Sequence, residues 1–97
     1  MLKLSRSNMI NPQNIIFHEL IGLEVEIKES PDTTLINVAG KIVFETRNML
    51  IIKTNRGFKK VAKTVAEKIK LFLPSGAVCF IRGPCLIGRA EDRVLRL

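Results

Sequence analysis

The residues of this sequence that could do chemistry are its lysines and arginines, which recur at predicted turns and on outward strand positions. Their cationic side chains can pair with phosphates, and arginine can fork two hydrogen bonds onto one phosphate. Because hairpin tips and one sheet face can merge in a small barrel, we expect a single positive surface that binds RNA. The candidate residues are Arg47, Arg56, Lys59, Lys60, Lys63, Lys68, Lys70, Arg82, Arg89 and Arg93.

The low aromatic content limits how such a surface could read nucleic acid. The chain has five phenylalanines, no tryptophan and no tyrosine. Stacking of bases requires aromatic platforms, so we expect recognition of RNA backbone and shape more than of sequence. The same composition predicts an aliphatic core of isoleucine, leucine and valine together with the phenylalanines.

No combination of residues predicts catalysis by this chain. The single histidine, His18, lies at the end of a predicted helix, where a structural or surface role is more common. Glu91 and Asp92 are adjacent, whereas acid–base work needs two carboxylates that face each other across a substrate. Cys79 and Cys85 lack the paired spacing of a zinc site and are expected to be ordinary buried thiols. We therefore predict no catalytic residue, no metal site and no cofactor on this chain.

Composition and charge favour one small domain with a polyanionic partner. A chain of 97 residues fits a single compact domain. Residues 1–46 hold four basic and six acidic residues, whereas residues 47–97 hold twelve basic and three acidic residues. Such a skew indicates a basic surface for a polyanion, although basic residues can also simply solvate a small domain. Without an export signal or an apolar run of membrane-spanning length, we expect a cytoplasmic protein that contacts no membrane.

Short strands are the elements that must position these residues. Apolar and polar residues alternate, or β-forming residues gather, in residues 23–28, 37–46, 49–54, 58–62, 68–73 and 77–82. Gly40 within a strand indicates a bulge or bend, and Gly57 suits the positive φ of a three-residue hairpin loop. We expect one all-β domain with a flexible arm over residues 1–10, a helix over 11–20, an antiparallel barrel of about six strands over 21–89 and a helix over 90–97.

One predicted hairpin has an apolar outer face. If Ile69 and Leu71 point inward, then Phe72, Val78 and Phe80 point outward together. An exposed apolar patch usually marks a surface for a partner, but a terminal helix could also cover it. These three residues are therefore candidates for a protein interface.

Several segments resemble the archaeal ribonuclease P protein component 1 family. Residues 19–27 (ELIGLEVEI) resemble the entry to its barrel, and residues 38–50 (VAGKIVFETRNML) carry its Gly–Lys and Glu–Thr–basic–Asn pattern. Residues 72–76 (FLPSG) resemble its next hairpin. Residues 83–93 (GPCLIGRAEDR) are similar to its Gly–Arg–Pro–Glu–Asp–Arg segment, with Ala90 in place of the usual proline. Val78 and Phe80 stand where polar residues are commoner in that family.

The resemblance implies both a fold and a function. The fold would be an Sm-like barrel with helical ends. The function would be that of a protein subunit of ribonuclease P, which removes the 5′ leader of precursor tRNA. In that family the RNA is the catalyst and uses magnesium, and this subunit pairs with a zinc-ribbon protein subunit.

Three other interpretations of the residues remain open at this point. Ile81, Arg82 and Gly83 resemble a short signature of Sm proteins, which favours a generic RNA chaperone that assembles into a homo-oligomeric ring. The basic face could instead bind an acidic protein. An independent nuclease would need residues that the sequence does not offer.

Overall fold

The computed structural model describes residues 19–88, and its regular structure there consists of β-strands and short 3-10 helices. The predicted arm over residues 1–10 and the predicted helix over 90–97 lie outside this part of the chain. So does most of the predicted helix over 11–20, and Glu19 and Leu20 at its end are not helical. Within residues 19–88, no helix is long and apolar enough to cross a membrane.

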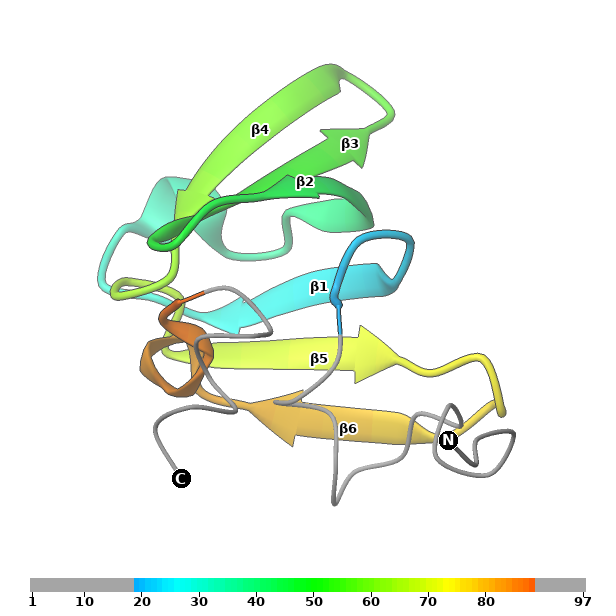
Figure 1. Cartoon of the computed structure of the whole chain (residues 1–97). Coiled ribbons are helices and arrows are strands. Elements are labelled where there is room, and N and C mark those ends of the chain that lie inside the picture. Colours follow the sequence, from blue (N-terminus) through cyan, green and yellow to red (C-terminus); the bar gives the residue numbers. More distant parts are fainter. Residues whose placement is uncertain (1–18, 89–97) are drawn as a thin grey trace.

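Six antiparallel strands form one sheet in the order β4-β3-β2-β1-β5-β6 (Figure 1). Each strand falls in a segment where the sequence pattern predicts one, so the predicted all-β architecture is confirmed. Two 3-10 helices, η2 (Thr33–Leu35) and η3 (Gly83–Leu86), lie outside the predicted strands. The strands are β1 (Glu24–Glu29), β2 (Ala39–Glu45), β3 (Met49–Thr54), β4 (Gly57–Ala62), β5 (Lys68–Phe72) and β6 (Val78–Ile81).

The core of the curled sheet is aliphatic. Side chains alternate between the two sides of a strand, and the inward ones that form the core are aliphatic apart from Cys79. No described phenylalanine contributes to the core, so the expectation of phenylalanines in the core is wrong for Phe44, Phe58, Phe72 and Phe80. Inward strand residues include Val25, Ile27, Ile42, Leu50, Ile52, Val61, Ile69, Leu71 and Cys79.

The two cysteines differ in their surroundings. Cys79 is buried as expected, and its burial raises the pKa of the thiol. Cys85 is exposed, contrary to expectation, because it lies on the outer side of η3 rather than on a strand.

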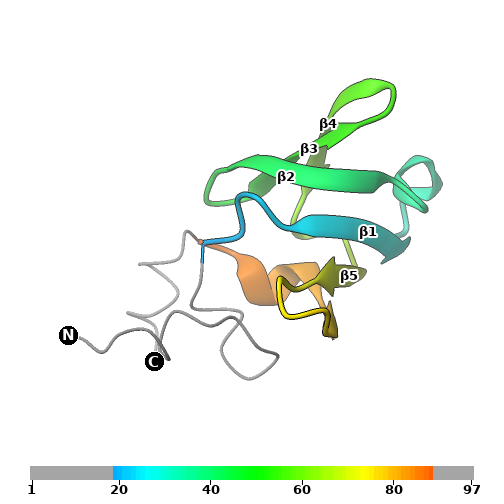
Figure 2. The same cartoon turned by 90° about the vertical axis from the view of Figure 1, so that its right-hand side faces the viewer.

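Strong curvature of the sheet depends on one glycine and on two irregularities of register. A Cβ at Gly40 would overlap the carbonyl oxygen of Lys53, so only glycine allows β2 and β3 to approach so closely there. The register shifts between Ile42 and Phe44 in β2, and between Ile27 and Glu29 in β1. Such bulges bend a strand and increase its twist. In Figures 1 and 2, β2, β3 and β4 form one half of the curled sheet, and β1, β5 and β6 form the other.

The end strands β4 and β6 share no ladder, and irregular segments link the two halves instead. The N–H of Gly83 donates to the carbonyl of Ala66, and the N–H of Gly88 donates to the carbonyl of Arg47, each at 2.7 Å. A Cβ at Gly83 would overlap the carbonyl oxygens of Lys63 and Ala66. The strand ladder of the barrel is therefore interrupted between β4 and β6, and these backbone contacts close the gap.

The side chain of Lys63 is buried among these contacts. The prediction that Lys63 binds RNA is therefore wrong. Its side chain is 0% exposed, and its ammonium donates to Oε2 of Glu45 at 2.7 Å. It also donates to the carbonyl oxygens of Thr46, Arg47 and Gly88, at 2.8, 3.2 and 2.8 Å. Removing an ammonium from water is costly unless the charge is paired and its donors are bonded, and these acceptors meet that condition.

Replacement of Lys63 by methionine should strongly destabilise the fold. The substitution keeps an apolar stem but removes the positive charge beside Glu45, whose carboxylate is only 1% exposed. Breaking a buried ion pair from one side costs about 3–5 kcal/mol. Urea unfolding of the full chain measures this cost. The matched control Lys60→Met removes an exposed lysine of β4 and should change the free energy of unfolding by less than about 0.5 kcal/mol. Equal effects of the two substitutions would contradict the closing role of Lys63.

Candidate functional site

All four described phenylalanines lie on the outside of the sheet. Their exposed fractions are 70% for Phe58, 55% for Phe80, 51% for Phe44 and 37% for Phe72. Burial of such a side chain contributes roughly 1.5–3 kcal/mol, so four outward rings forgo a large contribution for a small domain. Exposed apolar groups that gather in this way typically mark binding surfaces.

Phe72 and Phe80 belong to one of two outer surfaces, which we name the β5–β6 face and define as Lys68, Lys70, Phe72, Val78 and Phe80. Direct cross-strand pairs join Phe72 to Val78 and Lys70 to Phe80, so these side chains share one side of the hairpin. The predicted outward orientation of Phe72, Val78 and Phe80 is therefore confirmed. Ile69, Leu71, Leu73 and Cys79 are buried on the inner side.

Lysines lie over both rings of the β5–β6 face. The Nζ atom of Lys70 is 5.0 Å from the ring centroid of Phe72 and 6.0 Å from that of Phe80. The Nζ atom of Lys68 is 5.2 Å from the centroid of Phe80. These are cation–π distances, which at exposed sites contribute about 0.5–1 kcal/mol each. The two rings are thus partly covered by side chains of the same hairpin.

Acidic residues of β1 border this face and balance its charge. Glu24, Glu26 and Glu29 pair in register with Phe72, Lys70 and Lys68, respectively. The ammonium of Lys68 lies 3.7 Å from a carboxylate oxygen of Glu29, and both side chains are well exposed. Such a surface pair contributes little stability. It makes the face a mixture of apolar and oppositely charged groups, which suits a protein better than a polyanion.

The β3–β4 hairpin carries the second group of predicted RNA-binding residues. Its turn consists of Asn55 and Arg56, because Thr54 pairs directly with Gly57. The predicted positive φ of Gly57 is confirmed at 112°, whereas the predicted three-residue loop is one residue too long. The Thr54 hydroxyl accepts from the N–H of Arg56 at 3.1 Å, which stabilises the turn.

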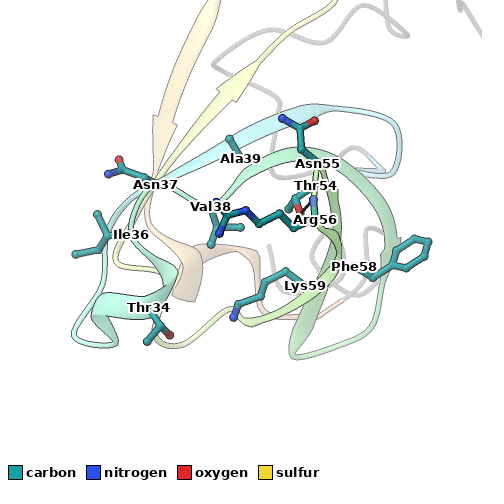
Figure 3. Close-up of a pocket in the computed structure, with 10 residues that line it drawn as sticks. All are labelled: Thr34, Ile36, Asn37, Val38, Ala39, Thr54, Asn55, Arg56, Phe58 and Lys59. Atoms are coloured by element: carbon teal, nitrogen blue, oxygen red, sulfur yellow. Dashed lines mark hydrogen bonds between the residues drawn. The ribbon is translucent and has the colours of Figure 1, made fainter.

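A cleft of about 560 Å³ separates this hairpin from the segment that joins η2 to β2 (Figure 3). Arg56 and Lys59 extend across it from the hairpin, toward Val38 and Thr34. Its lining therefore combines two cations with hydroxyl and amide groups, which could hold a phosphate. The lining residues are Thr34, Ile36, Asn37, Val38, Ala39, Thr54, Asn55, Arg56, Phe58 and Lys59.

Asp32, at the start of η2, adds a fixed negative charge near this cleft. The hydroxyl and the N–H of Thr34 donate to its carboxylate at 2.6 and 3.0 Å and hold its pKa below the usual range. The positive charge of Lys59 lowers this pKa further.

The predicted basic residues form two groups rather than the single surface that we expected. Arg56, Lys59 and Lys60 lie on the hairpin that ends in β4, at one end of the sheet. Lys68, Lys70 and Arg82 lie on or beside β5 and β6, at the other end (Figures 1 and 2). Arg47 is exposed in the β2–β3 turn. Lys63 is buried, and the predicted contacts Arg89 and Arg93 lie outside the described residues.

Sequence reasoning missed a second outer surface, the β2–β4 face, which we define as Lys41, Phe44, Ile51, Lys53, Phe58 and Lys60. Simple alternation places Phe44 on the same side as the buried Ile42. The bulge between them reverses this, so Phe44 points outward and Glu45 points inward. The period-two pattern alone carries no signal for that reversal.

Comparison with protein families matches residues 13–96 to the family described as ribonuclease P/MRP, subunit p29. The chain is 40% identical over 85 residues to ribonuclease P protein component 1 of Desulfurococcus amylolyticus, covering 88% of this chain and 92% of the relative. It is 45% identical over 87 residues to the protein of the same name from Methanocaldococcus jannaschii, covering 89% of this chain and 90% of the relative.

A solved structure shares the same fold. It is that of Mth11, described as a homologue of the human RNase P protein Rpp29, and it superposes with a TM-score of 0.57 at 36% identity. The match covers 78% of this chain and 97% of that structure. The family resemblance that the sequence motifs indicate is thus confirmed over nearly the whole chain, and the protein belongs to the ribonuclease P/MRP subunit p29 family.

Proposed function

We propose that this chain is a protein subunit of ribonuclease P, which binds the catalytic RNA and supports removal of the 5′ leader from precursor tRNA. The observation that carries the proposal is the match to archaeal ribonuclease P protein component 1 at 40–45% identity over about nine tenths of each chain. This match favours a subunit of that complex over a generic ring-forming Sm-like chaperone.

Cleavage itself would be the work of the RNA, with magnesium bound by the RNA. Among residues 19–88, no three His, Cys, Asp or Glu side chains gather in a way that could hold a metal ion. Exposed cations on this part of the chain would neutralise phosphates and so favour the compact, active fold of the RNA. Arg56, Lys59 and Lys60 on the hairpin supply one such set, and the exposed Arg47 and Arg82 are further candidates outside it.

The zinc-ribbon subunit of ribonuclease P is the protein partner that we propose for the β5–β6 face. This face presents Phe72, Val78 and Phe80 together, and its lysines are balanced by the carboxylates of β1. Aromatic side chains at the centre of a surface, with a charged rim, are the usual pattern of a protein interface. The cytoplasmic location expected from the sequence stays a prediction.

Reconstitution tests the proposed function directly. Precursor tRNA is incubated with archaeal ribonuclease P RNA and the zinc-ribbon subunit, with and without this chain. Addition of the chain should raise the cleavage rate or lower the magnesium concentration required, because its cations replace part of the magnesium that screens RNA phosphates. The chain alone should cleave nothing. The absence of any effect, together with a homo-oligomeric ring on sizing, would favour the generic chaperone instead.

The substitution Phe80→Glu should abolish binding of the zinc-ribbon subunit while the domain stays folded. Phe80 is 55% exposed, so the change removes an apolar contact and places a charge in the proposed interface without opening the core. We expect a loss of affinity of more than tenfold, measured by calorimetric titration with the purified partner. Phe58→Glu on the opposite face is the matched control and should bind normally. Unfolding of the Phe80→Glu variant, or unchanged affinity, would argue against this interface.

A further inference from the structure

The β2–β4 face combines exposed aromatic rings with lysines that form no ion pair among the described residues. Phe58 and Phe44 are 70% and 51% exposed, and Ile51, on the strand between theirs, pairs with Phe44. Within residues 19–88, the lysines found in ion pairs are Lys28, Lys63 and Lys68, none of which belongs to this face. The cation–π contacts of the described residues also lie elsewhere, on the β5–β6 face.

Two of its lysines face each other directly. Lys41 in β2 pairs in register with Lys53 in β3, and Lys53 pairs in turn with Phe58 in β4. Like charges directly opposite on neighbouring strands destabilise a sheet. The neighbouring set of cross-strand pairs on this face again contains an aromatic ring and a lysine. In it, Phe44 lies opposite Ile51, and Ile51 lies opposite Lys60. This arrangement concentrates positive charge around the two rings.

The two outer faces therefore suit different classes of partner. On the β5–β6 face, lysines lie over rings that stay 37% and 55% exposed, and carboxylates of β1 offset the lysines. On the β2–β4 face the rings are open, and the one carboxylate in register is that of Glu24, opposite Lys41 at the border. A partner with many negative charges and flat apolar groups complements the second face. Single-stranded RNA has both, because its phosphates are charged and every base has a π-face.

We propose that the β2–β4 face binds a single-stranded segment of RNA, with bases stacked on Phe58 and Phe44 and phosphates held by Lys41, Lys53 and Lys60. The proposal rests on the proposed function and adds a binding mode to it. Duplex RNA would satisfy the lysines but would keep its bases paired and away from the rings. The small number of aromatic residues does not oppose stacking, because every described phenylalanine is exposed.

The spacing of the rings requires more than one nucleotide. Phe44 and Phe58 lie two strands apart and two residues apart along the sheet, which corresponds to roughly 12 Å. One base cannot cover both rings, so separate bases of the strand would contact them.

A tryptophan probe tests this stacking directly, because the chain has no tryptophan of its own. The variants Phe58→Trp and Phe80→Trp each place one indole on one face, and each is titrated as the full chain with a ten-nucleotide oligouridylate. A base that stacks on an indole quenches its fluorescence. We expect saturable quenching for Phe58→Trp and none for Phe80→Trp.

Binding of labelled oligouridylate, measured by anisotropy, separates stacking from charge. Phe58→Ala should weaken binding by roughly tenfold, whereas Phe58→Trp should retain it and the matched control Phe80→Ala should not change it. Lys53→Ala should reduce the slope of log affinity against log salt by about 0.7, the value for one phosphate of a single strand. Thermal melting verifies that each variant is folded.

Three results would overturn the inference: no binding by the wild-type chain, equal quenching of both indoles, or a Phe58→Ala variant that binds like the wild type. Reconstituted cleavage of precursor tRNA is measured in parallel with the wild-type chain. Suppose that cleavage depends on the chain but that Phe58 does not affect oligouridylate binding. In that case only the stacking proposal fails. A wild-type chain that does not support cleavage means that the proposed function fails, whatever the oligouridylate result.

Discussion

The architecture depends on the buried ammonium of Lys63. A six-stranded sheet whose end strands share no ladder needs other contacts to close the gap between them. Lys63 follows β4, and its Nζ atom joins the Glu45 carboxylate, the β2–β3 turn and the carbonyl of Gly88 beyond η3. Four acceptors within 3.2 Å compensate the desolvation of the charge. A lysine can make this junction because its ammonium has three donors on a long stem, which an apolar side chain of the same size could not replace.

This closure lets a small domain present two outer faces with different chemistry. The inside of the curled sheet is filled by aliphatic side chains, and the larger aromatic rings lie outside. On the β5–β6 face, neighbouring lysines and the carboxylates of β1 moderate both the apolar character and the charge. On the β2–β4 face, neither the rings nor the lysines are offset in this way. For the proposed protein and RNA partners, such a separation would mean that each meets a surface that discourages the other.

Confirmed predictions concern features that depend on neighbours in the chain. The outward orientation of Phe72, Val78 and Phe80 follows from strict alternation, because the β5–β6 pairing contains no bulge. The positive φ of Gly57 follows from local turn chemistry. The family motifs in residues 38–50 and 83–93 are likewise read directly from the order of residues. The first two required only that side chains alternate along a strand and that glycine tolerates φ values that other residues avoid.

The sequence by itself therefore determined the strands, the side of the sheet on which residues of bulge-free strands lie, and the family. Tertiary structure decided how the barrel closes and which residues form the β2–β4 face. The partners of Lys63 lie 18 residues before it and 25 after it, so no local pattern distinguishes this buried lysine from the exposed lysines around it. The bulge between Ile42 and Phe44 shifts the register of β2 against β3, and it exchanges the sides of Phe44 and Glu45. The period-two pattern of a sequence predicts which way side chains point along one strand. The closing of a barrel depends instead on how strands that are distant in the sequence pair with one another.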